Sequence, residues 1–190
     1  MVDDDGSPPL RADARRNRDA LLRAAAAGFA AGDAPTLEKI ARDAGVGIGT
    51  LYRHFPTRES LVEAVYRTEL AAVCASVDGL LASHEPADAL REWMDRYAEF
   101  VTTKRGMAET FRAMVADGTL AAADTRAAID GAVGTLLAAG VRAGTLRADV
   151  EADDVVTVLV GIFVATQGSD DRARLGRLLD LVAAGCAPRS

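Results

Sequence analysis

The chain has 190 residues, of which 49% are hydrophobic and 26% charged, and its formal net charge is -6. This composition excludes a largely disordered chain, and the length suits one or two small domains. The longest mostly apolar run, Val155–Ala165, falls short of the roughly 20 residues of a membrane span. A secretory signal is not expected, because Asp3, Asp4 and Asp5 stand where basic residues are needed. Cys74 and Cys186 have no CxxC spacing, so we expect a cytoplasmic protein.

The charge is unevenly distributed along the chain. Residues 1–10 carry three Asp, and residues 11–60 carry nine Lys and Arg against six Asp and Glu. Residues 61–190 carry thirteen basic against nineteen acidic side chains. A basic segment attached to an acidic body favours an anionic partner for the basic segment alone.

The residues that favour helix are abundant, and alternating β-branched runs are nearly absent, so we predict an all-α fold. Gly32, Gly45, Pro56 and Gly144 mark turns between apolar periodic segments. The predicted helices cover approximately residues 13–31, 36–44, 46–55, 58–82, 86–103, 107–116, 120–143, 152–167 and 171–184. We expect a mobile acidic tail over 1–10, a three-helix domain over 11–57 and a larger helical domain over 58–190.

Residues 36–55 have the pattern of a helix-turn-helix, in which two short helices meet at a tight turn. Gly45 allows the left-handed turn backbone, and the small Ala41 lets the helices cross closely. Leu51 and Phe55, one turn apart, are expected to anchor the second helix. The other residues of the second helix are therefore expected to be exposed, namely Ile48, Gly49, Thr50, Tyr52, Arg53 and His54.

This exposed set suits the major groove of DNA. Ile48 matches a thymine methyl group, Gly49 lets the backbone approach closely, and Thr50 or Arg53 can bind a base edge or a phosphate. Free N–H groups at the helix starts also favour phosphate. The expected phosphate contacts are Tyr52, His54, Thr36 and Arg58. Packing of Tyr52 remains an alternative. The arginines at the start of the chain suit contacts with the DNA backbone or the minor groove, with simple solvation as the alternative; they are Arg11, Arg15, Arg16 and Arg18.

The segment resembles the DNA-binding domain of the TetR family of bacterial transcriptional regulators. The resemblance is carried by residues 36–61, including the Leu-Tyr-Arg-His-Phe run, and by the Gly-Phe-Ala-Ala-Gly end of the first helix. One departure is Gly47, where many members have a serine that caps the recognition helix. The resemblance implies operator contacts by Thr36, Ile48, Gly49, Thr50, Tyr52, Arg53, His54 and Arg58.

One recognition helix covers few base pairs, so such proteins bind as two-fold dimers at half-sites about 34 Å apart. The last two predicted helices have broad apolar faces that suit a dimer interface; the alternative is that both faces pack on the core of their own chain. The residues of these faces are Val155, Val158, Leu159, Ile162, Phe163, Leu175, Leu178, Leu179 and Val182. The family resemblance implies that the two chains form a four-helix bundle from these helices.

Two stripes of aromatic and Met residues follow helical spacing in the middle of the chain. Their members are Trp93, Tyr97, Phe100, Met107, Phe111 and Met114. Facing each other, they would line an apolar pocket for a small hydrophobic effector, which the resemblance also implies. The alternative is a filled core.

We therefore predict a DNA-binding, ligand-responsive homodimer, a repressor that a small apolar effector releases from a palindromic operator. The rival interpretation is a helical interaction or small-molecule-binding protein that does not bind DNA. Neither an enzyme nor a protein with a metal or cofactor is expected, because the two histidines, His54 and His84, have no neighbouring nucleophile or ligand cluster in sequence.

Overall fold

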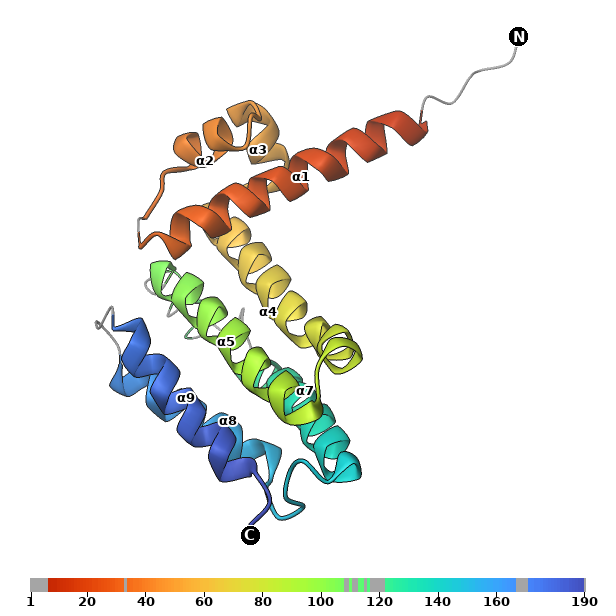
Figure 1. The fold of residues 1–190 in the computed structure, drawn as a ribbon. Coiled ribbons are helices and arrows are strands. Elements are labelled where there is room, and N and C mark those ends of the chain that lie inside the picture. Colours follow the sequence, from red (N-terminus) through yellow and green to blue (C-terminus); the bar gives the residue numbers. More distant parts are fainter. Residues whose placement is uncertain are drawn as a thin grey trace. The chain divides into compact units, whose positions relative to one another are not determined.

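The computed structural model describes residues 7–32, 34–107, 110, 113–114, 116, 122–166 and 171–189, and across these ranges all regular secondary structure is helical. Figure 1 shows the helices in chain order. They are α1 (Ser7–Ala30), α2 (Leu37–Asp43), α3 (Ile48–His54), α4 (Arg58–Ser83), α5 (Pro86–Gly106), α7 (Ala122–Ala143), α8 (Ala152–Ala165) and α9 (Arg172–Cys186). The predicted all-α class is confirmed. No helix in these ranges is long and apolar enough to cross a bilayer.

Most helix ends lie within a few residues of the prediction. The largest difference is at α1, which begins at Ser7 rather than near residue 13. Pro8 and Pro9 fall in the first turn of α1. Proline is tolerated there because backbone N–H groups in the first turn have no acceptor within the helix, so the missing N–H of proline breaks no hydrogen bond. The helix predicted over 107–116 lies partly outside the described residues, as do residues 1–6 of the expected tail.

The chain divides into two compact units. Unit 1 consists of Met1–Thr68 and Thr102–Leu120, and unit 2 consists of Glu69–Val101 and Ala121–Ser190. Two boundaries between the units fall inside helices. The boundary after Thr68 lies in α4, and the boundary after Val101 lies in α5.

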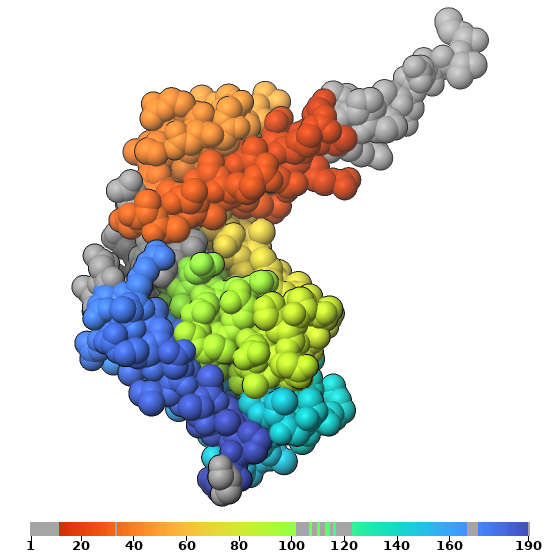
Figure 2. Space-filling model, in the orientation of Figure 1, coloured from red at the N-terminus to blue at the C-terminus, as the bar shows by residue number. Residues whose placement is uncertain are grey.

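In unit 1, α1 packs against both α2 and α3, and Figure 2 shows the side chains of these three helices in close contact. The buried face of α1 is the one predicted from its spacing, with Leu21, Leu22, Ala25 and Phe29 all out of solvent. Buried side chains from the other segments complete this core, namely Ile40, Ala41, Leu51, Phe55, Leu61, Val62, Val65 and Tyr66. The short helices therefore rest on α1, and the first half of α4 adds buried side chains to the same unit.

In unit 2, α8 packs against both α7 and α9. Polar contacts tie the helices together at their surfaces. Arg91 of α5 pairs with Asp180 of α9 at 2.7 Å, and Arg126 of α7 donates to the hydroxyl of Thr157 in α8 at 2.7 Å and pairs with Asp153. Such pairs between partly exposed side chains add little stability singly, so the buried apolar contacts hold this unit together.

The end of α7 is a close turn that the sequence marks with Gly144. Gly144 has φ of +71°, and its N–H and that of Thr145 donate to the carbonyls of Val141 and Gly140 at 3.1 and 2.9 Å. This is a Schellman motif, which closes a helix with glycine in the left-handed region. The chain then returns so that Leu146 is buried directly against Gly140.

Alanine at Gly140 is therefore expected to destabilise the protein, because its Cβ would lie 2.8 Å from the Cβ of Leu146 and closer still to the rest of that side chain. We expect Gly140→Ala to lower the free energy of unfolding by about 1–3 kcal/mol. Gly131, on the same helix, has open space around its Cβ position, so Gly131→Ala should raise stability by about 0.5–1 kcal/mol. Urea unfolding of both variants checks this pair, and equal effects would contradict it.

Candidate nucleic-acid interface

The turn between α2 and α3 has the geometry that the sequence predicted. Gly45 adopts φ of +67°, and its N–H donates to the carbonyl of Arg42 at 3.0 Å. The N–H of Val46 donates to the carbonyl of Ala41 at 2.9 Å. These two bonds form a Schellman motif, which satisfies carbonyls that the end of α2 would otherwise leave free. The turn thereby fixes the direction in which α3 leaves α2.

Helix α3 has one buried and one exposed side. Leu51 is fully buried and Phe55, directly after the helix, is 3% exposed, so both act as the anchors predicted for this helix. On the other side, Ile48 is 39% exposed and Tyr52 is 46% exposed. Gly49 and Arg53 are also exposed, whereas Thr50 and His54 are partly buried. The exposure of Tyr52 argues against a packing role for this residue.

The start of α3 lacks a side-chain cap. Gly47 occupies the N-cap position with an extended backbone, φ of -65° and ψ of 142°, and its carbonyl accepts from the N–H groups of Thr50 and Leu51. Open space surrounds its Cβ position, as it does at Gly49. The backbone at the N-terminal end of α3 is therefore accessible to a large partner.

Thr36 is the N-cap of helix α2, and its hydroxyl accepts the N–H of Lys39 at 3.2 Å. The ammonium group of Lys39 lies 2.7 Å from the carboxylate of Asp43 one turn later. This hydrogen bond and the positive charge of Lys39 lower the pKa of Asp43. Lys39 is thus already paired within its own helix, while the Thr36 side chain remains exposed.

The start of α4 is closed by a reciprocal pair of hydrogen bonds. The N–H of Ser60 donates to the hydroxyl of Thr57 at 3.1 Å, and the N–H of Thr57 donates to the hydroxyl of Ser60 at 3.2 Å. This is a capping box with serine in the place usually taken by Glu or Gln. The next residue, Arg58, donates from Nη1 to the carbonyl of Pro35 at 2.7 Å. Arg58 thus uses one of its guanidinium donors inside the unit and remains partly exposed, and its phosphate contact stays a prediction.

The arginines of α1 occupy different surroundings. Arg15 is exposed, and Arg16 pairs with Asp13 on its own helix. The guanidinium of Arg18 lies 5.5 Å from the centre of the Phe55 ring, at the end of α3. The side chain of Arg11 lies outside the described residues. Arg18 therefore covers the ring of Phe55, the residue that anchors the end of α3.

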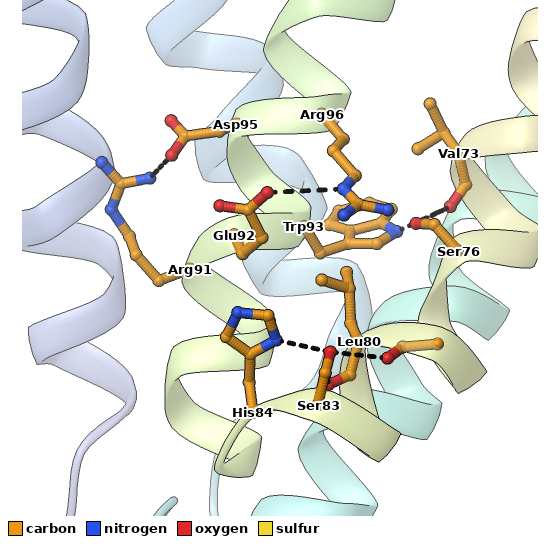
Figure 3. Close-up of polar contacts among 11 residues, drawn as sticks. Val73, Ser76, Leu80, Ser83, His84, Arg91, Glu92, Trp93, Asp95 and Arg96 are labelled. Atoms are coloured by element: carbon orange, nitrogen blue, oxygen red, sulfur yellow. Dashed lines mark hydrogen bonds and ion pairs between the residues drawn. The ribbon is translucent and has the colours of Figure 1, made fainter.

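The three aromatic residues that α5 contributes to the predicted effector pocket, Trp93, Tyr97 and Phe100, are buried. The ring centres of Trp93 and Tyr97 lie 5.4 Å apart, those of Tyr97 and Phe100 lie 6.0 Å apart, and Phe163 of α8 meets Tyr97 edge-on at 5.4 Å. The indole N–H of Trp93 donates to the carbonyl of Val73 at 3.2 Å, as Figure 3 shows. These rings form one cluster in unit 2.

The second stripe cannot be followed in full. Met107 and Met114 are buried and belong to unit 1, and Phe111 lies outside the described residues. A pocket lined by both stripes therefore stays a prediction.

An apolar groove of about 420 Å³ runs between α8 and α9, two helices that lie side by side in Figure 1. Five of the nine residues predicted for the dimer interface line it, namely Val155, Val158, Ile162, Leu178 and Val182. Leu159, Phe163 and Leu179 are buried within the unit, and Leu175 is half-buried outside the groove lining.

Leu181, which was not among the predicted interface residues, lines the groove and is 69% exposed. Its position three residues after Leu178 and four before Gly185 was the available signal, because that spacing puts all three on one side of a helix. Val158 is 50% exposed on the facing helix, so the groove presents large apolar side chains to solvent. Within the described ranges, no group of three or more His, Cys, Asp or Glu side chains could hold a metal ion.

An all-helical chain that presents a glycine-turned helix pair, with the second helix exposed along one side, defines a DNA-binding protein of the helix-turn-helix class. Residues 21–65 match the family described as bacterial regulatory proteins, tetR family, and residues 85–188 match the transcriptional regulator SbtR-like, C-terminal domain. This chain belongs to the TetR family of bacterial transcriptional regulators.

Two solved structures support this membership along nearly the whole chain. A TetR transcriptional regulator from Streptomyces coelicolor is 46% identical, with coverage of 91% of this chain and 99% of that chain and a TM-score of 0.82. A TetR regulatory protein from Mycobacterium vanbaalenii is 35% identical, with coverage of 95% and 100% and a TM-score of 0.73. No curated protein matches the sequence. Regulators of this family bind DNA, typically dimerise and generally act without enzymatic activity.

The two sides of α3 should respond differently to truncation. Leu51→Ala removes a fully buried side chain and is expected to lower the free energy of unfolding by about 2–5 kcal/mol. Tyr52→Ala, at the next position, removes an exposed side chain and should change it by no more than about 0.5 kcal/mol. Denaturant unfolding followed by circular dichroism measures both, and a large loss in Tyr52→Ala would show that this ring packs in the core.

Proposed function

We propose that the protein is a homodimeric repressor that binds a palindromic operator through α3 and leaves it when a small apolar effector binds. The observation that carries the proposal is the two-sided character of α3. Buried Leu51 and Phe55 fix the helix, while Ile48 and Tyr52 stand exposed beside the accessible backbone of Gly49. A rigid helix with one exposed side of mixed chemistry is what reading base edges in the major groove requires.

Each of the predicted contact residues has a chemically suitable role in this proposal. Ile48 contacts a thymine methyl group, and the bare backbone of Gly49 lets α3 approach the base pairs. Thr50 and Arg53 donate to base edges or phosphates. The remaining proposed contacts go to phosphates and come from Thr36, Tyr52, His54 and Arg58.

We also assign the groove between α8 and α9 to the dimer interface. What supports the assignment is the apolar character of its exposed side chains, above all Val158 and Leu181. A second copy of the chain, placed on the same groove by a two-fold axis, would cover both and form a four-helix bundle. Leu159, Phe163 and Leu179 would then support the interface from the core beneath it.

For the effector we propose the aromatic cluster of Trp93, Tyr97, Phe100 and Phe163. A small apolar molecule bound among these rings would favour an arrangement of the dimer that no longer fits the operator. Helix α4 is the proposed route of coupling, because it begins in the DNA-binding segment at Arg58 and continues to Ser83.

The alternative is a helical interaction or small-molecule-binding protein without DNA affinity. Selection of bound duplexes from a random pool separates the two interpretations. We expect an enriched palindrome whose half-sites lie about 34 Å apart, or a multiple of this distance. Failure of the folded dimer to enrich any sequence at low salt would refute the repressor proposal.

Removal of one cation from α3 should weaken DNA binding in a salt-dependent manner. Arg53→Met is expected to lower operator affinity by about tenfold or more and to reduce the slope of log affinity against log salt, because fewer counterions are released. The matched control is Arg67→Met, which removes the same charge from α4, where Arg67 pairs with Glu63 at 2.8 Å. Equal losses in both variants, measured by fluorescence anisotropy, would count against α3 as the recognition helix.

The proposed interface predicts a change of oligomeric state. The double variant Val158→Asp, Leu181→Asp puts four unpaired charges into the interface of a dimer and should convert it to a monomer. Val141→Asp changes an exposed apolar residue of α7 outside the groove lining and should remain dimeric. Light scattering after size exclusion distinguishes the two states, and a double variant that stays dimeric would rule out this groove.

A further inference from the structure

Glu69 lies on the side of α4 that unit 2 buries. Within this unit, the buried side of α4 consists of Val73, Val77 and Leu80. Glu69 precedes Val73 by four residues, so it lies on the same side of the helix, one turn or about 6 Å further back. Glu69 is itself half-buried. The buried side of α4 thus continues into a carboxylate at a position where an apolar side chain is the usual choice.

The carboxylate of Glu69 has no counter-ion among the residues that the structure describes. Burial raises the pKa of Glu69, because the loss of water destabilises the charged form of a carboxyl group. Within the described ranges no cation lowers this pKa again, in contrast to Asp43, whose pKa is lowered by Lys39. A half-buried carboxylate without a partner is suited to a ligand that brings the positive charge.

The aromatic cluster of unit 2 lies next to this side of α4. The indole N–H of Trp93 donates to the carbonyl of Val73, as Figure 3 shows. Two residues separate α4 from α5, so the chain reverses its direction between these helices. One turn back from Val73 along α4 reaches Glu69. One turn on from Trp93 along α5 reaches the same level at Tyr97, so the carboxylate and the rings belong to one region of the unit.

Stacked rings beside a carboxylate have the chemistry that binds an organic cation. The rings of Trp93 and Tyr97 are nearly parallel, with an angle of 15° between their planes. The face of an aromatic ring carries partial negative charge, and tryptophan attracts a cation most strongly. The rings can therefore contact the apolar part of a ligand and its positive charge together, while the carboxylate supplies the counter-ion.

We propose that the effector of unit 2 is a small apolar cation, an aromatic or alkyl ammonium compound, whose charge pairs with Glu69 while its apolar part contacts Trp93 and Tyr97. This inference rests on the effector site proposed above and adds one positive charge to the apolar molecule expected there. The alternative is a carboxylate that water alone solvates, and in that case the affinity of the site does not depend on the charge of the ligand.

The experiment compares two compounds of the same shape and different charge. Trp93 is the only tryptophan of the chain, so its fluorescence reports on the cluster. The full-length protein is titrated with benzyltrimethylammonium and with neopentylbenzene, in which an uncharged carbon replaces the nitrogen. We expect the wild type to bind the ammonium compound more tightly by about tenfold or more.

A matched pair of variants tests the part played by Glu69. Glu69→Gln keeps the shape of the side chain and removes its charge, so it should weaken binding of the ammonium compound by about tenfold or more and leave binding of neopentylbenzene unchanged. The control is Asp78→Asn, which removes a carboxylate from the exposed side of the same helix and should bind both compounds as the wild type does.

Three results would overturn the proposal. Equal affinity of the wild type for the two compounds, or unchanged ammonium binding in Glu69→Gln, would leave the cluster as a site for neutral molecules. Equal losses of both compounds in Glu69→Gln would assign the residue a purely structural role. Failure of both compounds to change the fluorescence of Trp93 would refute the effector site as well, whereas the DNA-binding proposal is tested separately by selection of duplexes. The comparison in wild type needs no variant, so it decides the matter even if Glu69→Gln does not fold.

Discussion

The structure depends on the burial of one side of α3 against the rest of unit 1. Seven residues form about two turns of helix, and so short a helix has no stability of its own. Leu51 and Phe55 bury their side chains in the core of unit 1, and this burial holds α3 in place. Because the anchors occupy one side, the opposite side with Ile48 and Tyr52 is left free for a partner.

Specific hydrogen bonds satisfy the backbone groups at the ends of these helices. The Gly45 turn satisfies the last carbonyls of α2, and the Thr57–Ser60 pair satisfies the first amides of α4. Just before α2, the carbonyl of Pro35 accepts a hydrogen bond from the side chain of Arg58. Polar contacts of this kind add modest stability, but each has a narrow geometry and so fixes an angle that apolar burial alone would leave loose.

Much of the DNA-binding segment could be predicted from the sequence, because its signals are local. Glycine at a left-handed position, threonine before a helix and two apolar residues one turn apart each have one common structural meaning. The contact of Arg58 with Pro35 was not predictable in this way, because 23 residues separate the partners and an arginine near a helix start equally suits a phosphate.

In α8 and α9, the side of the helix that is buried could not be predicted from the sequence. Val158 and Leu159 are neighbours of similar chemistry, yet the first is half exposed and the second is buried. When a helix is apolar on several sides, its spacing cannot indicate which side meets its own chain. That choice depends on where α7 and α9 lie, which only the folded structure establishes.

The central claim is that the exposed side of α3 enters the major groove at two symmetric half-sites. Dimethyl sulfate footprinting tests it most directly, since this reagent methylates guanine N7, which faces the major groove. The account predicts two patches of protected guanines, related by a two-fold axis and centred about 10 base pairs apart or a multiple of that spacing. Binding that leaves every guanine N7 reactive would contradict it.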